Sequence, residues 1–174
     1  KTINYYLGVT PGALADYEKA MADTKATLAE LRREGAVANE FDKCKAWWEE
    51  HLNVMQVEIP DADAMRQINI WNPVQSVHTG RYSRSISSSA SGVRGIGFRD
   101  SAQDMLAQAY RKPEWALDML KYLASLQLED GHPVHIAWPE ENKPAQDITR
   151  SDNHLWMIYL AHAIVAETGK VDTL

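Results

Sequence analysis

The sequence predicts a mostly α-helical protein, and three observations lead to this prediction. Apolar residues recur at intervals of three and four over most of the chain, which is the spacing of one face of a helix. Runs with β-strand character are brief and isolated. Proline, glycine and capping residues stand where most of the helical patterns begin or end. With 174 residues, of which 45% are hydrophobic and 24% charged, the chain can bury a core.

The first part of the chain is expected to hold one short strand and two helices. The β-prone run Ile3–Val9 predicts the strand. The first helix, Asp16–Arg33, has an apolar stripe and ends before Gly35. The second helix runs from Ala38 to Leu52, and its stripe contains Phe41, Cys44, Trp48 and Leu52. Cys44 is therefore expected in the core.

The segment Val54–Pro60 reads as extended, and Pro60–Asp61 marks a boundary before a new domain. From Ala62 the pattern predicts a helix that is kinked at Pro73, because a proline ring clashes with the carbonyl four residues earlier. One face of this helix is expected to contain Met65, Ile68, Trp71 and Gln75.

The rest of the chain is expected to be helical around one extended stretch. The predicted elements are, in order, a short helix over Ala102–Tyr110, a longer helix over Pro113–Gln127, an extended stretch His135–Trp138 and a polar loop Pro139–Thr149. The last helix, Asp152–Glu167, is capped by Ser151 and ended by Gly169. It is apolar nearly all round, so we expect it to be buried.

Composition excludes several classes of protein. The net charge of −6 argues against a nucleic-acid surface, which needs a basic face. A single cysteine excludes an internal disulfide framework and fits a reducing compartment, so a cytoplasmic location is expected. No apolar run approaches membrane-spanning length. The chain begins at Lys1 rather than at a methionine, and we expect it to be a piece of a longer polypeptide.

The stretch Val93–Met105, V-R-G-I-G-F-R-D-S-A-Q-D-M, concentrates charge and glycine just before a helical pattern. Glycines let a backbone approach a ligand closely, and arginine–carboxylate sets bind hydroxyls or anions. This profile predicts a polar binding surface. The alternative is a simple loop in which Asp100 or Ser101 caps the following helix.

Two other groups of residues leave alternatives open. Asp130, His132 and His135 could hold a metal, but on an extended backbone the two histidines point to opposite faces, so sugar contact or a structural role is favoured. Three tryptophans flank the polar stretches, where they could stack on sugars, although core packing is the default for each: Trp71, Trp138 and Trp156.

Taken together, several segments resemble glycoside hydrolase family 94, the inverting cellobiose, chitobiose and cellobionic acid phosphorylases. They are Asn69-Ile-Trp-Asn-Pro73, Ser83-Arg-Ser85, Arg94-Gly-Ile-Gly-Phe-Arg-Asp-Ser-Ala-Gln-Asp104, Glu129-Asp-Gly131 with His135, and Ser151-Asp-Asn-His-Leu-Trp156. The resemblance implies that residues 1–10 end an N-terminal β-sandwich, residues 11–60 form a helical linker, and residues 61–174 open an (α/α)6 catalytic toroid. It also implies a homodimer in the full-length enzyme.

The resemblance further implies phosphorolysis of a β-linked glucosyl disaccharide. Arg94 and Asp100 would hold the transferred glucosyl unit, and Arg84 would help to bind phosphate, although the Arg84–Arg94 segment is one residue shorter than in the family. Phosphate is itself the nucleophile, so the reaction needs an acid but not the second carboxylate of an inverting hydrolase, and it yields an α-sugar 1-phosphate. No metal and no cofactor besides the phosphate co-substrate is implied.

The family's general acid lies in a G-D-W-N-D motif that this sequence does not contain. No catalytic acid is therefore assigned, and Asp152 is explained as a carboxylate at a helix N-terminus. Two other functions stay open. One is the phosphorylase-like module of a cyclic β-1,2-glucan synthase, and the other is a non-catalytic glycan-binding helical domain.

Overall fold

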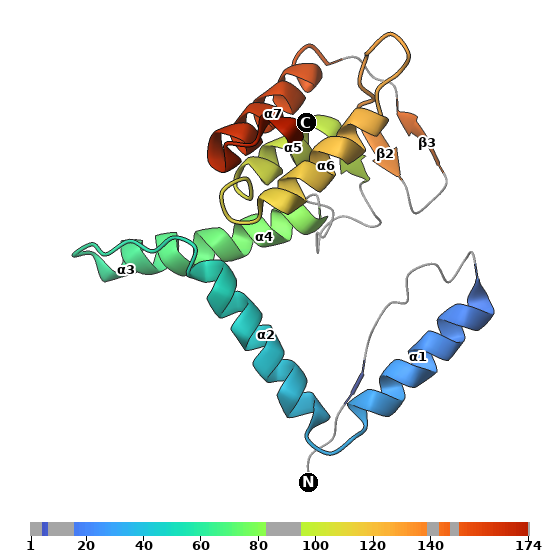
Figure 1. The fold of residues 1–174 in the computed structure, drawn as a ribbon, viewed down its shortest axis with the longest axis vertical. Helices are drawn as coiled ribbons and strands as arrows, with labels where there is room; N and C mark the ends of the chain where they lie inside the picture. Colours follow the sequence, from blue (N-terminus) through green and yellow to red (C-terminus); the bar gives the residue numbers. More distant parts are fainter. Residues whose placement is uncertain (1–4, 7–15, 83–94, 139–142, 147–149, 174) are drawn as a thin grey trace. The chain divides into compact units, whose positions relative to one another are not determined.

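The computed structural model describes residues 5–6, 16–82, 95–138, 143–146 and 150–173, which are mostly helical, as predicted (Figure 1). The chain divides into two compact units, residues 1–51 and 52–174. The predicted division at residues 10 and 60 remains a prediction. In the described part of the chain, no helix combines the length and the apolar character that crossing a membrane requires.

The described part of the first unit consists mainly of two helices. Helix α1, Tyr17–Leu31, begins where Asp16 accepts a hydrogen bond from the Lys19 amide at 3.0 Å. Helix α2, Ala36–Leu52, begins two residues before the predicted start, after a turn in which Gly35 has φ of +78°. That left-handed conformation is the reason for a glycine at the turn.

The predicted burial of Cys44 is wrong, because this side chain is exposed. Helices α1 and α2 have few contacts with each other, and only Ala20 and His51 are buried in them. The Phe41 side chain, on the predicted stripe, is 70% exposed. The predicted strand over residues 3–9 lies largely outside the described residues.

The second unit begins with a helical rod that contains a π-helical turn before Pro73. Helix α3, Ala62–Arg66, is capped by Asp61, and it continues through the π-helix Gln67–Trp71 into α4, Asn72–Tyr82. In the π-turn the Asn72 amide donates to the carbonyl of Gln67, five residues earlier. In a regular α-helix the proline ring would clash with the carbonyl four residues earlier. The wider π-turn leaves room for the ring.

The π-turn also changes which face of the rod is buried. The predicted face is wrong in its second half, because Trp71 is 50% exposed and Gln75 is exposed. The buried positions are Asn69, Pro73, Val77 and Gly80. One extra residue in the turn rotates the following residues about the helix axis, so a stripe drawn with uniform helical spacing goes out of phase.

Three packed helices form the core of the second unit: α5, Phe98–Leu106; α6, Pro113–Ser125; and α7, Asn153–Thr168. Helix α5 begins four residues before the predicted start, and α6 begins at Pro113 as predicted. Their shared core consists of Phe98, Ala102, Met105, Ala109, Ala116, Leu120, Leu123, Leu160 and Ile164. These residues anchor the first turn of α5, where the charged motif lies.

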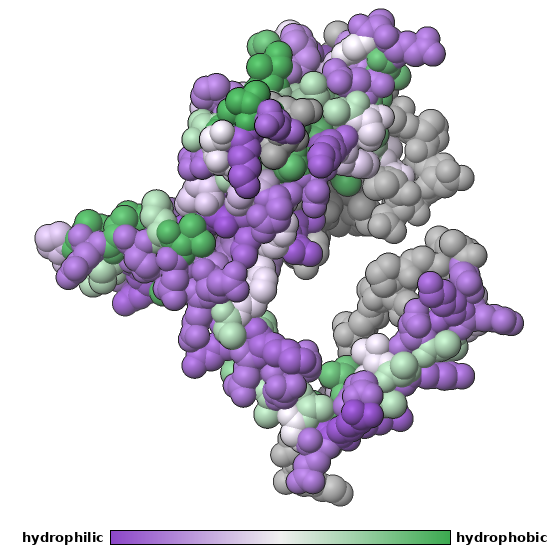
Figure 2. Space-filling view, in the orientation of Figure 1, coloured by the Kyte–Doolittle hydropathy of each residue, from purple (hydrophilic) through white to green (hydrophobic). Residues whose placement is uncertain are grey.

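Helix α7 ends at Gly169 as predicted, in the left-handed conformation with φ of +66°. Its predicted burial is wrong for one face: Leu155, Ile158 and Tyr159 are 55%, 62% and 54% exposed. Figure 2 shows hydrophobic surface in this region. Helices α5 and α6 cover only the opposite face, because two neighbours cannot surround a helix.

A small antiparallel sheet, in the order β1-β2-β3, lies beside the helices. It consists of β1, Ile96–Gly97; β2, Ile136–Trp138; and β3, Lys143–Gln146. Strand β2 confirms the predicted extended stretch. Strand β1 lies in the glycine motif and β3 in the predicted loop, and both are too short to show an alternating pattern in sequence.

Candidate functional site

The sheet positions the charged motif, because strand β1 is followed directly by helix α5. Gly97 pairs with Ile136 across β1 and β2, and the Phe98 amide then donates to the carbonyl of His135 at 3.0 Å. Gly97 is the N-cap residue of α5, in an extended conformation. Asp100 therefore lies in the first helical turn, and the alternative in which Asp100 or Ser101 caps the helix is wrong.

Gly95 allows β1 to approach β2 where no other residue would fit. Its φ is +78°, and an added Cβ would lie 2.6 Å from Nε1 of Trp138 and 2.7 Å from Cγ2 of Ile136. Both the conformation and the contact exclude a side chain. Trp138 is half-buried in this contact, so it packs beside the motif.

We expect Gly95→Ala to destabilise the protein by about 2–6 kcal/mol, because left-handed strain and overpacking each cost roughly 1–3 kcal/mol. The matched control is Gly131→Ala. Gly131 also has positive φ, +83°, but an added Cβ would meet nothing within 4 Å. The control should lose only about 1–2 kcal/mol. Urea unfolding monitored by tryptophan fluorescence measures both losses, and equal losses would contradict the close approach at Gly95.

A chain of polar contacts joins the first turn of α5 to the start of α7. Arg99 places Nε 3.6 Å from Oδ1 of Asp100 and Nη1 3.4 Å from Oδ2 of Asp152. Trp156 Nε1 donates to the same Oδ2 of Asp152 at 3.2 Å. The three charged side chains are about two-fifths exposed. We call Asp100, Arg99, Asp152 and Trp156 the carboxylate–arginine chain.

Asp152 stands at the N-cap position of α7, in place of the predicted Ser151, but its side chain makes no capping hydrogen bond. Its carboxylate is directed to Trp156 and Arg99 instead. The hydrogen bond from Trp156 is the main reason that the pKa of Asp152 is lowered, and the positive charge of Arg99 adds to it. Asp152 is thus held as a carboxylate at the N-terminus of a helix, as predicted, and its side chain also contacts Arg99 of α5, which was not predicted.

His135 lies within electrostatic range of the carboxylate–arginine chain. Burial lowers the pKa of His135, the positive charges of Arg150 and Arg99 lower it further, and Asp100 opposes them. These effects favour the neutral form of the imidazole. Its Nδ1 atom is buried and has no hydrogen-bond partner among the described residues. A neutral imidazole beside a carboxylate can exchange hydrogen bonds with a sugar hydroxyl.

The alternative metal site does not form a cluster. Asp130 instead accepts a hydrogen bond from the His132 amide at 2.9 Å and so closes its own turn. In the part of the chain that is described, no three histidine, cysteine or carboxylate residues come together as metal ligands would.

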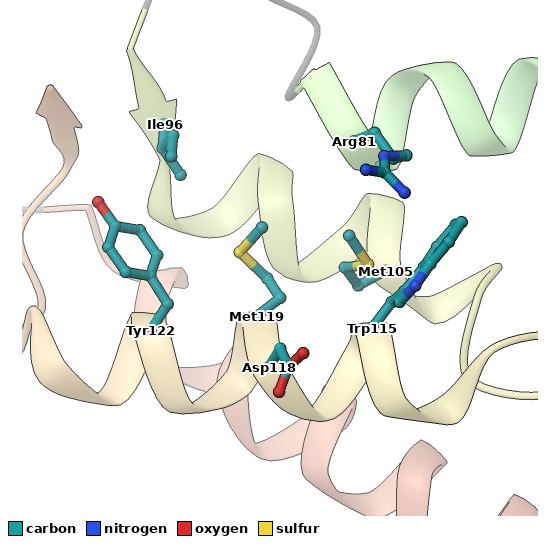
Figure 3. A pocket seen from close by; sticks show the side chains of 8 residues that line it. Arg81, Ile96, Met105, Trp115, Asp118, Met119 and Tyr122 are labelled. Atoms are coloured by element: carbon teal, nitrogen blue, oxygen red, sulfur yellow. The ribbon is translucent and has the colours of Figure 1, made fainter. Parts of the chain in front are cut away.

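Arg84 and Arg94 lie outside the described residues. Nearby, Arg81 stacks on Trp115, with its guanidinium carbon 4.8 Å from the ring centroid. Figure 3 shows this pair at one end of an open pocket of about 460 Å³. The pocket is lined by Gly80, Arg81, Ile96, Met105, Trp115, Asp118, Met119 and Tyr122. It contains no member of the carboxylate–arginine chain.

The sequence pattern indicated Asp100 but missed the partner role of Arg99 and Asp152. The motif contains Arg99, so the charge of this residue was evident from the sequence. Its pairing with Asp152, 53 positions away, was not. Fold and site together define the class: a helical protein with a cluster of charged hydrogen-bonding groups at the starts of two packed helices. Such a cluster suits a ligand rich in hydroxyls or an anion.

The chain belongs to the glycosyl hydrolase 94 superfamily, because residues 47–174 match the model of its catalytic domain. It is 32% identical over 153 residues to the cyclic β-(1,2)-glucan synthase NdvB of Rhizobium meliloti, covering 86% of this chain and 5% of the relative. It is 28% identical over 155 residues to the N,N'-diacetylchitobiose phosphorylase of Vibrio proteolyticus, covering 75% of this chain and 19% of the relative.

The corresponding phosphorylase of Vibrio furnissii is 27% identical over 154 residues, covering 74% of this chain and 19% of the relative. The chain therefore spans at most about a fifth of these relatives' length. The comparisons confirm the family that the sequence motifs resemble.

Proposed function

We propose that this chain is the opening part of the catalytic domain of an inverting glycoside phosphorylase. The observation that carries the proposal is the match of residues 47–174 to the family's catalytic domain, with Asp100 in the first turn of a helix that its core holds firmly. In this proposal the helices after residue 60 begin an (α/α)6 toroid. The enzyme cleaves a β-linked glucosyl disaccharide with inorganic phosphate and needs no other cofactor.

The proposed roles follow the charges of the motif. Asp100 accepts hydrogen bonds from hydroxyls of the transferred glycosyl unit, and Arg94 donates to the same unit. Arg84 orients phosphate for attack on the anomeric carbon from the face opposite the leaving sugar. That geometry inverts the anomeric centre and gives an α-sugar 1-phosphate. A carboxylic acid supplied by residues outside this chain protonates the departing oxygen.

A second candidate is the phosphorylase-like module of a cyclic β-1,2-glucan synthase. The observation that favours it is the 32% identity to such a synthase across 86% of this chain. The two candidates share the reaction and differ in the acceptor. Incubating the full-length protein with phosphate and either cellobiose, chitobiose or β-1,2-linked glucan separates them, with the α-sugar 1-phosphate identified by NMR. Formation of the β-anomer would contradict both.

The phosphate role is tested by Arg84→Ala in the full-length protein. A charge-assisted contact contributes about 1.5–3 kcal/mol, so the phosphate KM should rise roughly 10- to 100-fold with a smaller change for the disaccharide. Arg81→Ala is the matched control, because its guanidinium already stacks on Trp115. Unchanged phosphate dependence in Arg84→Ala would remove its role, and a rise confined to the control would transfer the role to Arg81.

A further inference from the structure

We propose that Asp152 is a positioning residue that orients the sugar-binding carboxylate of Asp100 through Arg99. This inference rests on the proposed function, since it assigns a task to Asp152 in that same site. The residues come from two elements, α5 and the start of α7, that share a buried core. Because the two helices are held together by this core, Asp152 at the start of α7 has a fixed position relative to the first turn of α5, where Asp100 lies.

The geometry shows why Arg99 needs a second carboxylate. A guanidinium beside one carboxylate prefers to bind both of its oxygens. Here Arg99 meets Oδ1 of Asp100 through Nε at 3.6 Å, while its Nη1 reaches both oxygens of Asp152 at 3.4 and 3.5 Å. Arg99 thus lies between the two carboxylates, and Asp100 is met only by its Nε edge.

One further contact holds this arrangement. Trp156, one helical turn beyond Asp152, donates to the Asp152 carboxylate at 3.2 Å and fixes its rotamer. On the other side, Asp100 lies close to β1: a Cβ added at Gly97 would be 3.7 Å from Oδ2, an ordinary van der Waals distance.

The competing explanation is that Asp152 only joins two helices. Its side chain makes no capping hydrogen bond to α7, and its ion pair with Arg99 is about two-fifths exposed, so it contributes little to stability. A purely structural role therefore predicts almost no effect on kinetics. A positioning role predicts a loss of turnover without a loss of stability.

The test uses Asp152→Asn in the full-length protein, because asparagine can still accept the Trp156 hydrogen bond. We expect kcat to fall roughly 10- to 100-fold, as small misplacements of a binding group do, with the phosphate KM and melting temperature unchanged. Asp152→Glu, which keeps the charge, should recover part of the rate. Asp63→Asn is the control, since it breaks the 2.9 Å surface pair with Arg66.

A double-mutant cycle separates the two proposals. If Asp152 acts through Asp100, adding Asp152→Asn to Asp100→Asn should cause little further loss of kcat. Normal kinetics in Asp100→Asn would overturn the proposed function itself. A slow Asp100→Asn with a normal Asp152→Asn, or fully additive losses, would overturn only the positioning role. If Asp152→Asn fails to fold, Trp156→Phe replaces it, and normal kcat in that variant counts against the proposal.

Discussion

Replacing Asp100 by Asn in the full-length protein is expected to lower kcat for phosphorolysis about 100-fold or more. Each charge-assisted hydrogen bond contributes roughly 1.5–3 kcal/mol, and a carboxylate that accepts two sugar hydroxyls would lose both contributions. Asparagine has nearly the same shape but carries no charge and one acceptor oxygen fewer. Steady-state kinetics with the disaccharide and phosphate varied separately measures the effect.

The fold should survive this substitution. Asp100 is not the N-cap residue of α5, its side chain is 41% exposed, and the residues around it in sequence are anchored by Phe98 and Ala102 in the core. Asp42→Asn, at an exposed position of α2, is the matched control for removal of one carboxylate. Wild-type kinetics in Asp100→Asn would reject sugar binding by this residue.

The second large effect is expected when residues 1–174 are expressed alone. We expect no detectable phosphorolysis, because the sequence lacks the G-D-W-N-D motif in which the family resemblance places the general acid. We also expect self-association through α7, where Leu155, Ile158 and Tyr159 are more than half exposed. Burying each such side chain gains roughly 1.5–3 kcal/mol, a large fraction of a typical domain stability of about 5–15 kcal/mol.

Size-exclusion chromatography and an assay of α-sugar 1-phosphate turnover test this expectation together. Ile158→Lys should increase the monomeric fraction, because it places a charge in the centre of the exposed face. Val171→Lys, at an exposed apolar position beyond α7, is the control. A monodisperse, active wild-type monomer would contradict both the family mechanism and the role of this face.

The elements that could be predicted from sequence depend on residues close to one another in the chain. Asp16 caps α1, Pro113 begins α6 and Gly169 ends α7, as their local preferences require. Such signals act through the backbone of one helical turn, so no distant partner is needed. The position of Asp100 close to a helix start was predictable for the same reason, although the actual cap, Gly97, was not.

The tertiary structure decided everything that depends on pairing across the chain. Strand β1 has two residues, too few for a pattern, and exists because β2 pairs with it. The π-turn before Pro73 shifts the buried face of the rod, which uniform spacing cannot reveal. By itself the sequence determined the helical class, the family and a charged motif. Only the packing of α5 against α7 placed Asp152 beside Arg99, because an ion pair between residues 53 positions apart has no local signal.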